Sequence, residues 1–424
     1  MAKPPRNQLV GWPDIHPASS TARWNTGRPK NRTAQFGIDD VAPVVGLQPV
    51  FIQKVLGKRH DINLDDIRQL MLLDDASETF VPRSKTIEYF EKTASRRTAT
   101  GFKAERIPEG QVVCGDAHKL IPSLEDDSID CVVTSTPYWA VRIYGTPKDV
   151  EWADGEICPY GHEQTPEGFI RHSVELLVLL KPKVKHSGSV WWNLGDTFNT
   201  RTQIRGNASE TLQAMKGMDK RKWSEQNCRR YSAGHAYLTD GEQCLIPHRI
   251  AERASRVGYL VKSMITWRKD GSLPEPTLSR VTRASEYILH IAKQRSPHFD
   301  KSAYRTVPAV LGGRNLLDER DQVTDVWHLP TSAGRDGHGA QFPLALPGRC
   351  ISLSTPKDGL VLDPFAGSGT TGLAAARLGR RFIGFDVSPE YTSTANSRLA
   401  QDAQSTEPNA APKKKRPSKA AKES

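Results

Sequence analysis

The sequence has few cysteines and no long hydrophobic run. Only 6 of its 424 residues are cysteine, which is too few for the disulfide framework of a small secreted protein. No stretch approaches the roughly 18 consecutive apolar residues that cross a bilayer. The first residues, from Met1 to Arg6, also lack the apolar segment of a signal peptide. These absences exclude a disulfide scaffold and a membrane partner, and they predict a soluble protein of the cytoplasm.

Acidic residues are outnumbered by basic ones. The chain has 59 Lys+Arg against 48 Asp+Glu, a formal net charge of +11. Such a balance favours an anionic partner such as nucleic acid, although a solvated basic surface gives the same composition. Residues 401–424 are rich in Pro, Ala, Ser and Lys, and we expect a disordered basic tail available to phosphate groups. Its run from Pro412 to Pro417 would place the protein in a nucleus only if it acted as a targeting signal.

The first quarter of the chain differs from the rest. Residues 1 to about 45 are rich in Pro, Arg, Asn, Thr and Gly and have little periodicity, so they predict an irregular arm. From Val50 to about Thr93 the spacing of leucine and isoleucine indicates short amphipathic helices, with Asn63 or Asp65 as a cap. Together they form a predicted N-terminal extension, residues 1–105.

Strand-like and helical segments alternate through residues 106–400, which predicts one α/β domain with a mainly parallel sheet. Two non-periodic segments, residues 200–243 and 296–325, interrupt the alternation. The predicted strands are 111–116, 131–134, 189–194, 260–267 and 286–292, and the predicted helices are 117–124, 166–180 and 247–257.

Two fragments follow apolar runs of strand type. Thr134–Tyr138 comes after Cys131-Val132-Val133, and Asp363–Thr371 comes after Leu360-Val361-Leu362. Open α/β sheets bind their ligands at the carboxyl ends of strands. The two fragments, although more than two hundred residues apart, are therefore expected to share one crevice.

The second fragment has the order strand, glycine turn, helix. Gly367 and Gly369 lack a Cβ atom, so a ligand can approach the backbone closely. A phosphate-binding P-loop needs Lys after its last glycine, but Thr370 follows Gly369, and the spacing of the dinucleotide fingerprint is not kept either. The next strand ends in Asp386, which is placed to accept hydrogen bonds from a ribose or to cap the following helix.

The fragment Asp363–Thr371 resembles the S-adenosylmethionine-binding motif of amino-directed DNA methyltransferases, and Ser135-Thr136-Pro137-Tyr138 resembles their catalytic tetrapeptide. The order, catalytic motif first, is similar to that of the permuted β-type enzymes. The resemblance covers about Gln111 to Leu399 and includes Trp192–Asp196 and Gly339–Pro343. It implies a circularly permuted Rossmann-like S-adenosylmethionine-dependent methyltransferase, with a helical N-terminal extension and a DNA-recognition insertion.

The resemblance also implies roles for individual residues. Ser135 Oγ and the Thr136 carbonyl would accept the two hydrogens of an exocyclic amino group, and Pro137 completes the motif before Tyr138, which would stack on a base flipped out of the duplex. Asp116 would lie on the adenine side of S-adenosyl-L-methionine and Asp386 at its ribose. The other cofactor residues would be Phe342, Pro343, Asp363, Phe365, Gly367, Ser368, Gly369 and Thr370.

The tetrapeptide departs from the family at Thr136, where proline is usual. Thr136 keeps the backbone carbonyl, but it lacks the restriction that a proline would place on the φ angle. Ser135 favours N4 of cytosine as the target, with N6 of adenine as the alternative. Because of Thr136, a catalytically weakened DNA-binding relative is a further alternative. Methylation of RNA or protein is a third, and carbon methylation is disfavoured because the Pro-Cys pair of cytosine C5 enzymes is absent.

The expected partner is double-stranded DNA, with a cognate restriction endonuclease as a second partner and a monomer or dimer as the assembly. Segments 200–243 and 296–325 are the candidates for DNA recognition. No metal is expected, because the cysteines and histidines lack the paired short spacings of a zinc site; those weighed are Cys158, His162, Cys228, His235, Cys244 and His248. The predicted DNA-binding residues are Arg201, Arg205, Lys220, Arg221, Lys222, Arg229 and Arg230.

Overall fold

A computed structural model gives the fold of the chain. It describes residues 33–57, 61–73, 79–97, 107–139, 148–163, 165–199, 238–239, 241–269, 277–316, 319–329 and 342–406.

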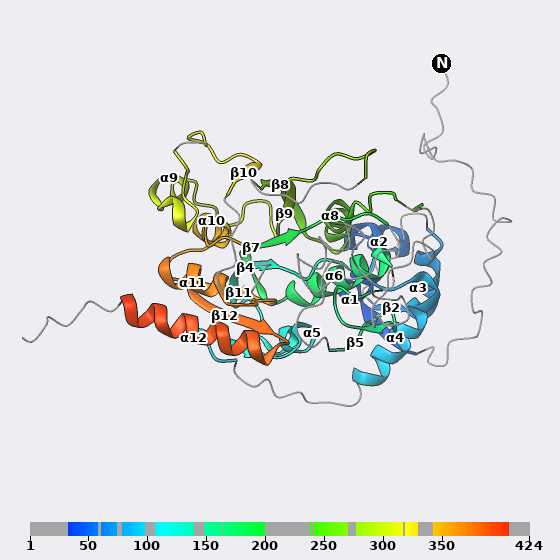
Figure 1. The fold of residues 1–424 in the computed structure, drawn as a ribbon. Helices are drawn as coiled ribbons and strands as arrows, with labels where there is room; N and C mark the ends of the chain where they lie inside the picture. The colour runs from blue at the N-terminus through cyan, green and yellow to red at the C-terminus, as the bar shows by residue number, and fades with distance from the viewer. Residues whose placement is uncertain are drawn as a thin grey trace, which may run out of the picture.

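The centre of the molecule is a sheet of eight strands in the order β10-β8-β9-β7-β4-β11-β12-β3 (Figure 1). Neighbouring strands are parallel except at β9, which runs antiparallel to both β7 and β8. The mainly parallel α/β fold expected from the sequence is therefore confirmed. The strands are β3 (Gln111–Cys114), β4 (Ile129–Ser135), β7 (Val184–Leu194), β8 (Leu260–Arg268), β9 (Ser285–Ala292), β10 (Val326–His328), β11 (Leu360–Asp363) and β12 (Arg381–Asp386).

The strands β4 and β11, which come from distant parts of the chain, are parallel neighbours. All four residues of β11 and the first six of β4 are buried, as in strands covered by helices on both faces. Parallel neighbours end at the same edge of a sheet. The pairing therefore places Ser135 and Asp363, the last residues of these strands, at one edge, as the sequence predicts.

Successive side chains of the central strands enter two different cores. In β4, Val132 packs into the core on the side of α6 (Pro166–Leu180) and α8 (Ile246–Arg256). Cys131 and Val133 pack into the core on the side of α10 (Ala345–Ser354) and α11 (Thr370–Arg377). This alternation is the period of two that a strand imposes. The sheet is thus a central layer between two layers of helices.

The N-terminal extension is more ordered than its composition suggests. It contains β1 (Gln35–Gly37), α1 (Ile38–Val45), α2 (Pro49–Leu56), β2 (Asp61–Asn63), α3 (Leu64–Met71) and α4 (Arg83–Arg97). The prediction of an irregular arm up to about residue 45 is wrong for residues 35–45, because β1 pairs with β2 and the apolar side of α1 is buried. Asn63 caps α3 as expected, since its side chain accepts hydrogen bonds from the backbone of Asp65 and Asp66.

Short elements connect the main ones: α5 (Ala117–Leu120), the 3-10 helices Ile121–Ser123 and Ala309–Leu311, the hairpin β5 (Val150–Glu151) and β6 (Ile157–Cys158), and α9 (Ala303–Thr306). At the other end of the chain, α12 (Pro389–Thr406) continues six residues into the region predicted to be a disordered tail, so that prediction is wrong for residues 401–406. Among the described residues, no helix is long and apolar enough to span a membrane.

Candidate active site

The catalytic tetrapeptide of the sequence lies where β4 ends. Ser135 is the last residue of the strand and is paired in register with Asn193 of β7. The Asn193 amide donates hydrogen bonds to Ser135 Oγ at 3.2 Å and to the Tyr138 hydroxyl at 2.8 Å. Asn193 is only 1% exposed, and its Oδ1 atom has no hydrogen-bond partner among the residues that the structure describes. The site therefore contains a buried acceptor, on the residue paired with Ser135, that no described residue uses.

Tyr138 is held by a charged residue of β9 and by one that follows β8. Its hydroxyl donates to Glu286, and Lys269 forms an ion pair with the same carboxylate. Glu286 lies near the start of β9, which is antiparallel to β7 and β8, so this start reaches the edge at which β7 ends. The ring of Tyr138 packs on the chain at Gly195, where an added Cβ would approach within 2.6 Å of it.

Thr136, the departure from the family pattern, is buried and hydrogen-bonded. It is 3% exposed, and its hydroxyl accepts a hydrogen bond from the indole nitrogen of Trp192 at 3.2 Å. Trp192 is a buried residue of β7. Thus a side-chain hydrogen bond to the neighbouring strand restrains the position where proline would restrict the backbone.

A single carboxylate connects the two fragments. Asp363 is fully buried, and its Oδ1 atom accepts hydrogen bonds from Thr134 Oγ1 at 2.7 Å and from the backbone of Phe365 at 3.0 Å. Its Oδ2 atom accepts from Thr371 Oγ1 at 2.5 Å. Burial raises the pKa of Asp363 to about 6. These contacts make Asp363 a link between β4, the glycine turn and α11, and both of its oxygens are occupied within the protein.

The glycine turn is shaped by φ angles that favour glycine. Gly367 has φ +52° and Gly369 has φ +81°, in the left-handed region. Space around Gly367 is open, whereas a Cβ at Gly369 would approach Ala395 at 3.0 Å. The backbone N–H of Gly367 donates to Asp386 Oδ2 at 2.9 Å. The turn therefore leaves open space at Gly367 and packs closely against α12 at Gly369.

The remaining predicted cofactor residues lie around this turn or at neighbouring strand ends. Asp386 ends β12, accepts from the backbone of Ser388, and has a pKa raised by burial. Asp116 follows the adjacent strand β3 and caps α5. Phe365 stacks on Tyr160 with ring centroids 5.1 Å apart. Two residues of the turn, Ser368 and Thr370, are each 7% exposed.

Phe342 and Pro343 precede α10, and Phe342 packs against the core that contains Ala366. The structure thus brings the fragments from β4, β11, β12 and β3 to one edge of the sheet. No described contact joins Phe342 or Pro343 to the tetrapeptide or to Asp363.

Two residues that sequence reasoning missed belong to this site, Asn193 and Glu286. Asn193 lies inside Trp192–Asp196, a segment the resemblance covers, but its pairing with Ser135 depends on the neighbouring strand. No sequence pattern distinguishes Glu286 from the other acidic residues of the chain.

The seven predicted DNA-binding residues, from Arg201 to Arg230, lie outside the described residues, as do Gly339, Ala340 and Gln341. Segment 296–325 is described apart from residues 317 and 318. It is anchored by the buried Arg349 of α10, which pairs with Glu319 and donates to the carbonyls of Gly312 and Gly313.

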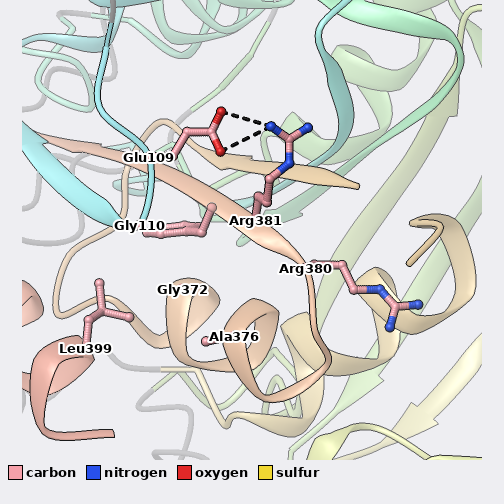
Figure 2. Close-up of a pocket in the computed structure, with 8 residues that line it drawn as sticks. Glu109, Gly110, Gly372, Ala376, Arg380, Arg381 and Leu399 are labelled. Atoms are coloured by element: carbon pink, nitrogen blue, oxygen red, sulfur yellow. Dashed lines mark hydrogen bonds and ion pairs between the residues drawn. The ribbon is translucent and has the colours of Figure 1, made fainter. Parts of the chain in front are cut away.

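A cavity of about 300 Å³ lies at the other edge of the sheet. Its lining includes the ion pair between Glu109 and Arg381, and Figure 2 shows Gly372, Ala376 and Leu399 below that pair. Arg381 begins β12, whereas the fragments described above follow the ends of strands. The cavity is therefore separate from the candidate active site.

Comparison with known proteins gives a family match. A DNA methylase family of N6 and N4 methyltransferases matches residues 129–397. Over 296 residues the chain is 28% identical to the type II methyltransferase M.SmaI of Serratia marcescens, and the match covers 68% of this chain and 90% of that protein.

Two solved structures are similar. The PvuII DNA methyltransferase (cytosine-N4-specific) has a TM-score of 0.47 and 19% identity, and the match covers 71% of this chain and 93% of the other. A putative DNA modification methylase from Thermus thermophilus, complexed with S-adenosyl-L-methionine, has a TM-score of 0.43 and 22% identity, over 69% of this chain and 93% of the other.

Proposed function

Because the chain belongs to the DNA methylase family of N6 and N4 methyltransferases, we propose that it transfers a methyl group from S-adenosylmethionine to N4 of cytosine in double-stranded DNA. The observation that carries the proposal is the set of hydrogen-bond acceptors beside the glycine turn. Ser135 Oγ lies at the end of β4, Asn193 Oδ1 of the paired strand β7 has no hydrogen-bond partner among the described residues, and Thr134 is bonded directly to Asp363 of the turn.

The residues of the glycine turn fit the cofactor. Open space at Gly367 lets a ligand approach the backbone, and the carboxylates of Asp386 and Asp116 at neighbouring strand ends suit ribose hydroxyls and an adenine amino group. When bound, S-adenosylmethionine supplies an electrophilic methyl group. Asp363, a predicted cofactor residue, orients Thr134 and Thr371 and so fixes the turn relative to β4.

Methyl transfer to an amino group depends on hydrogen-bond acceptors around that group more than on a catalytic general base. An exocyclic NH₂ group has two hydrogens, and holding both in hydrogen bonds directs the nitrogen lone pair away from them, toward the methyl donor. Ser135 Oγ, the Thr136 carbonyl and Asn193 Oδ1 supply these acceptors. Since Asn193 Oδ1 has no hydrogen-bond partner among the described residues, an amino hydrogen that reached it would remove the cost of an unpaired polar atom.

Tyr138 provides a face for the base. Its hydroxyl is fixed by Asn193 and Glu286, so the ring has one orientation before the substrate arrives. A base must leave the duplex to reach this edge of the sheet, and aromatic stacking offsets part of the cost of unstacking. Ser135 favours cytosine N4 over adenine N6, while the same acceptors suit either amino group.

We assign DNA recognition to two segments of the chain. Segment 296–325, anchored by Arg349, and the basic residues of segment 200–243 are our candidates for phosphate and base contacts. As a member of a family with type II relatives, the protein is proposed to work beside a cognate restriction endonuclease that cuts the same sequence.

The test is the modified-nucleoside content of DNA from a host that expresses the chain and otherwise lacks amino methylation. We expect N4-methylcytosine by mass spectrometry, and single-molecule sequencing then gives its sequence context. Ser135→Ala should abolish the product, whereas Ser393→Ala, at an exposed position of α12, should leave it unchanged. If N6-methyladenine alone appeared, the target would be adenine and not cytosine. Absence of both products would contradict the proposal.

Thr136 favours one alternative function, a relative that binds DNA without methylating it. Calorimetry with S-adenosylmethionine separates the two, since such a relative would bind the cofactor and give no turnover on any duplex. The hydrogen bond from Trp192 to Thr136 favours an active enzyme, because it restrains the one residue of the tetrapeptide that differs from the family pattern.

A further inference from the structure

A compact group of side chains lies behind the tetrapeptide and plays no part in the proposed reaction. It contains Asp154, Glu156, Cys158, Glu163 and His172, and we call it the 154–172 cluster. Three of its members come from the β5–β6 hairpin and its turn, Glu163 from the following loop and His172 from α6. His172 is 0% exposed, Glu163 1% and Asp154 3%. Arg171 pairs with Asp154 Oδ2 at 2.8 Å and offsets one of these carboxylates, and the other buried acids around the imidazole require further positive charge.

The donor atoms are spaced as the ligands of a small metal ion are. Glu156, Cys158 and His172 each offer one atom, and the three atoms lie within 4.8 Å of one another. His172 Nε2 lies 3.3 Å from Asp154 Oδ1 and 3.8 Å from Glu156 Oε2. In a tetrahedral zinc site with bonds of about 2.0 to 2.3 Å, neighbouring ligand atoms are about 3.3 to 3.8 Å apart. The two separations from His172 lie in this range, and Cys158 Sγ lies within 4.8 Å of the donor atoms of Glu156 and His172.

The imidazole is oriented in the way that metal-binding histidines are. His172 Nδ1 contacts Glu163 Oε1 at 3.1 Å, which leaves Nε2 facing Asp154 and Glu156. A carboxylate on the far nitrogen of a ligating histidine is the usual arrangement around zinc. The other oxygen of Glu163 is buried and has no hydrogen-bond partner in the described part of the chain, so the described residues leave one polar atom of this cluster unsatisfied.

We propose that the 154–172 cluster binds a structural zinc ion through four side chains: Asp154, Glu156, Cys158 and His172. The site is closed, since all four ligands come from the protein and Cys158 is only 9% exposed. Sequence spacing did not predict it, because Cys158 pairs with His172 on α6 and with two carboxylates. The sequence predicted no metal site, and His162, weighed there together with Cys158, is not in this set.

The position of the cluster gives the ion a structural role. Trp139, next to the tetrapeptide, donates its indole N–H to the Glu163 carbonyl at 2.9 Å. A Cβ added at Gly161 would lie 3.1 Å from Pro137, and Tyr160 stacks on Phe365 of the glycine turn. Cross-linking the hairpin to α6 would therefore stabilise the layer on which both the tetrapeptide and the turn rest.

The alternative is a metal-free cluster with a charged imidazole. Although burial lowers it, hydrogen bonds with Asp154 and Glu163 raise the pKa of His172 to about 9, so an imidazolium ion could balance the carboxylates. Metal content separates the two states directly. It does not depend on methyl transfer, so failure of one proposal leaves the other standing.

The first experiment measures zinc in the full chain, purified without chelators, by mass spectrometry of the elements. We expect about one zinc per chain. Replacement by Co²⁺ should produce a sulfur-to-cobalt charge-transfer band in the near ultraviolet, because one ligand is a thiolate. A protein that contains no zinc and takes up neither Zn²⁺ nor Co²⁺ has the imidazolium cluster, and the proposal is then wrong.

Variants then test the ligand set. Cys158→Ser should lose the cobalt band and most of the zinc, and its unfolding temperature should fall by at least about 4 °C. Cys350→Ser makes the same change at a buried thiol of α10, outside the cluster, and should keep zinc and the band. Glu163→Gln, which alters only the support of His172, should weaken zinc binding about 10- to 100-fold. Full zinc and an intact band in Cys158→Ser would overturn the assignment.

Discussion

The glycine turn and the tetrapeptide lie at the same edge of the sheet but are held in different ways. Around the turn, hydrogen bonds join residues close in sequence: Thr371 to Asp363, 8 residues apart, and Gly367 to Asp386, 19 residues apart. Around the tetrapeptide, Asn193 and Tyr138 are 55 residues apart, and Tyr138 and Glu286 are 148. The glycine turn is thus held mainly by local contacts, whereas the contacts of the tetrapeptide form only when distant strands have assembled.

The largest effect is expected where the two sides meet, at Asp363. Asp363→Ala leaves two hydroxyls and one backbone N–H without their acceptor in a fully buried place. We expect a loss of about 3 kcal/mol or more in the free energy of unfolding, measured in urea, together with loss of methylation. If stability were unchanged, Asp363 would not join the two sides.

Asn193→Ala tests the substrate side alone. It removes the free acceptor and the donor to Ser135 and Tyr138, so turnover should fall about 100-fold. Cofactor binding should remain, because the glycine turn does not contact Asn193 in the described structure. Calorimetry with S-adenosylmethionine and a labelled-methyl assay measure the two quantities, and equal losses in both would contradict the separation.

Substitution of Glu286, also on the substrate side, should lower turnover less than Asn193→Ala does. Tyr138→Phe and Glu286→Gln each remove part of one network, so their effects on turnover should not add. We expect a coupling energy of about 1 kcal/mol in a double-mutant cycle. Additive losses would show that Glu286 does not act through Tyr138.

Thr136 should give the smallest change. Thr136→Val keeps the shape and removes the hydroxyl that accepts from Trp192, at a cost of about 1 kcal/mol in stability. Activity should fall less than in Asn193→Ala. Thr136→Pro, which introduces the residue usual in the family, should give a methylation rate equal to or above that of the unchanged protein. A Thr136→Val enzyme of unchanged stability would mean that the hydrogen bond does not restrain the loop.

Much of this site could be predicted because strand ends in a parallel sheet meet at one edge. The apolar runs before Thr134 and Asp363 were sufficient to place both fragments there, and Asn63 was identified as a helix cap from local pattern alone. Helix α6 has the bounds that its apolar spacing predicts. The order in residues 35–45 was missed because it depends on pairing with β2 and on burial of α1, which composition does not encode.

The sequence by itself determined the glycine turn, the tetrapeptide and their order in the chain, since each is a contiguous pattern that follows a buried strand. Only the tertiary structure decided which side chains meet across the sheet. Asn193 faces Ser135 because β7 pairs in register with β4, and Glu286 reaches Tyr138 because β9 runs antiparallel. The 154–172 cluster forms because a hairpin folds onto α6. Such contacts depend on strand register and helix packing, which distant residues set together.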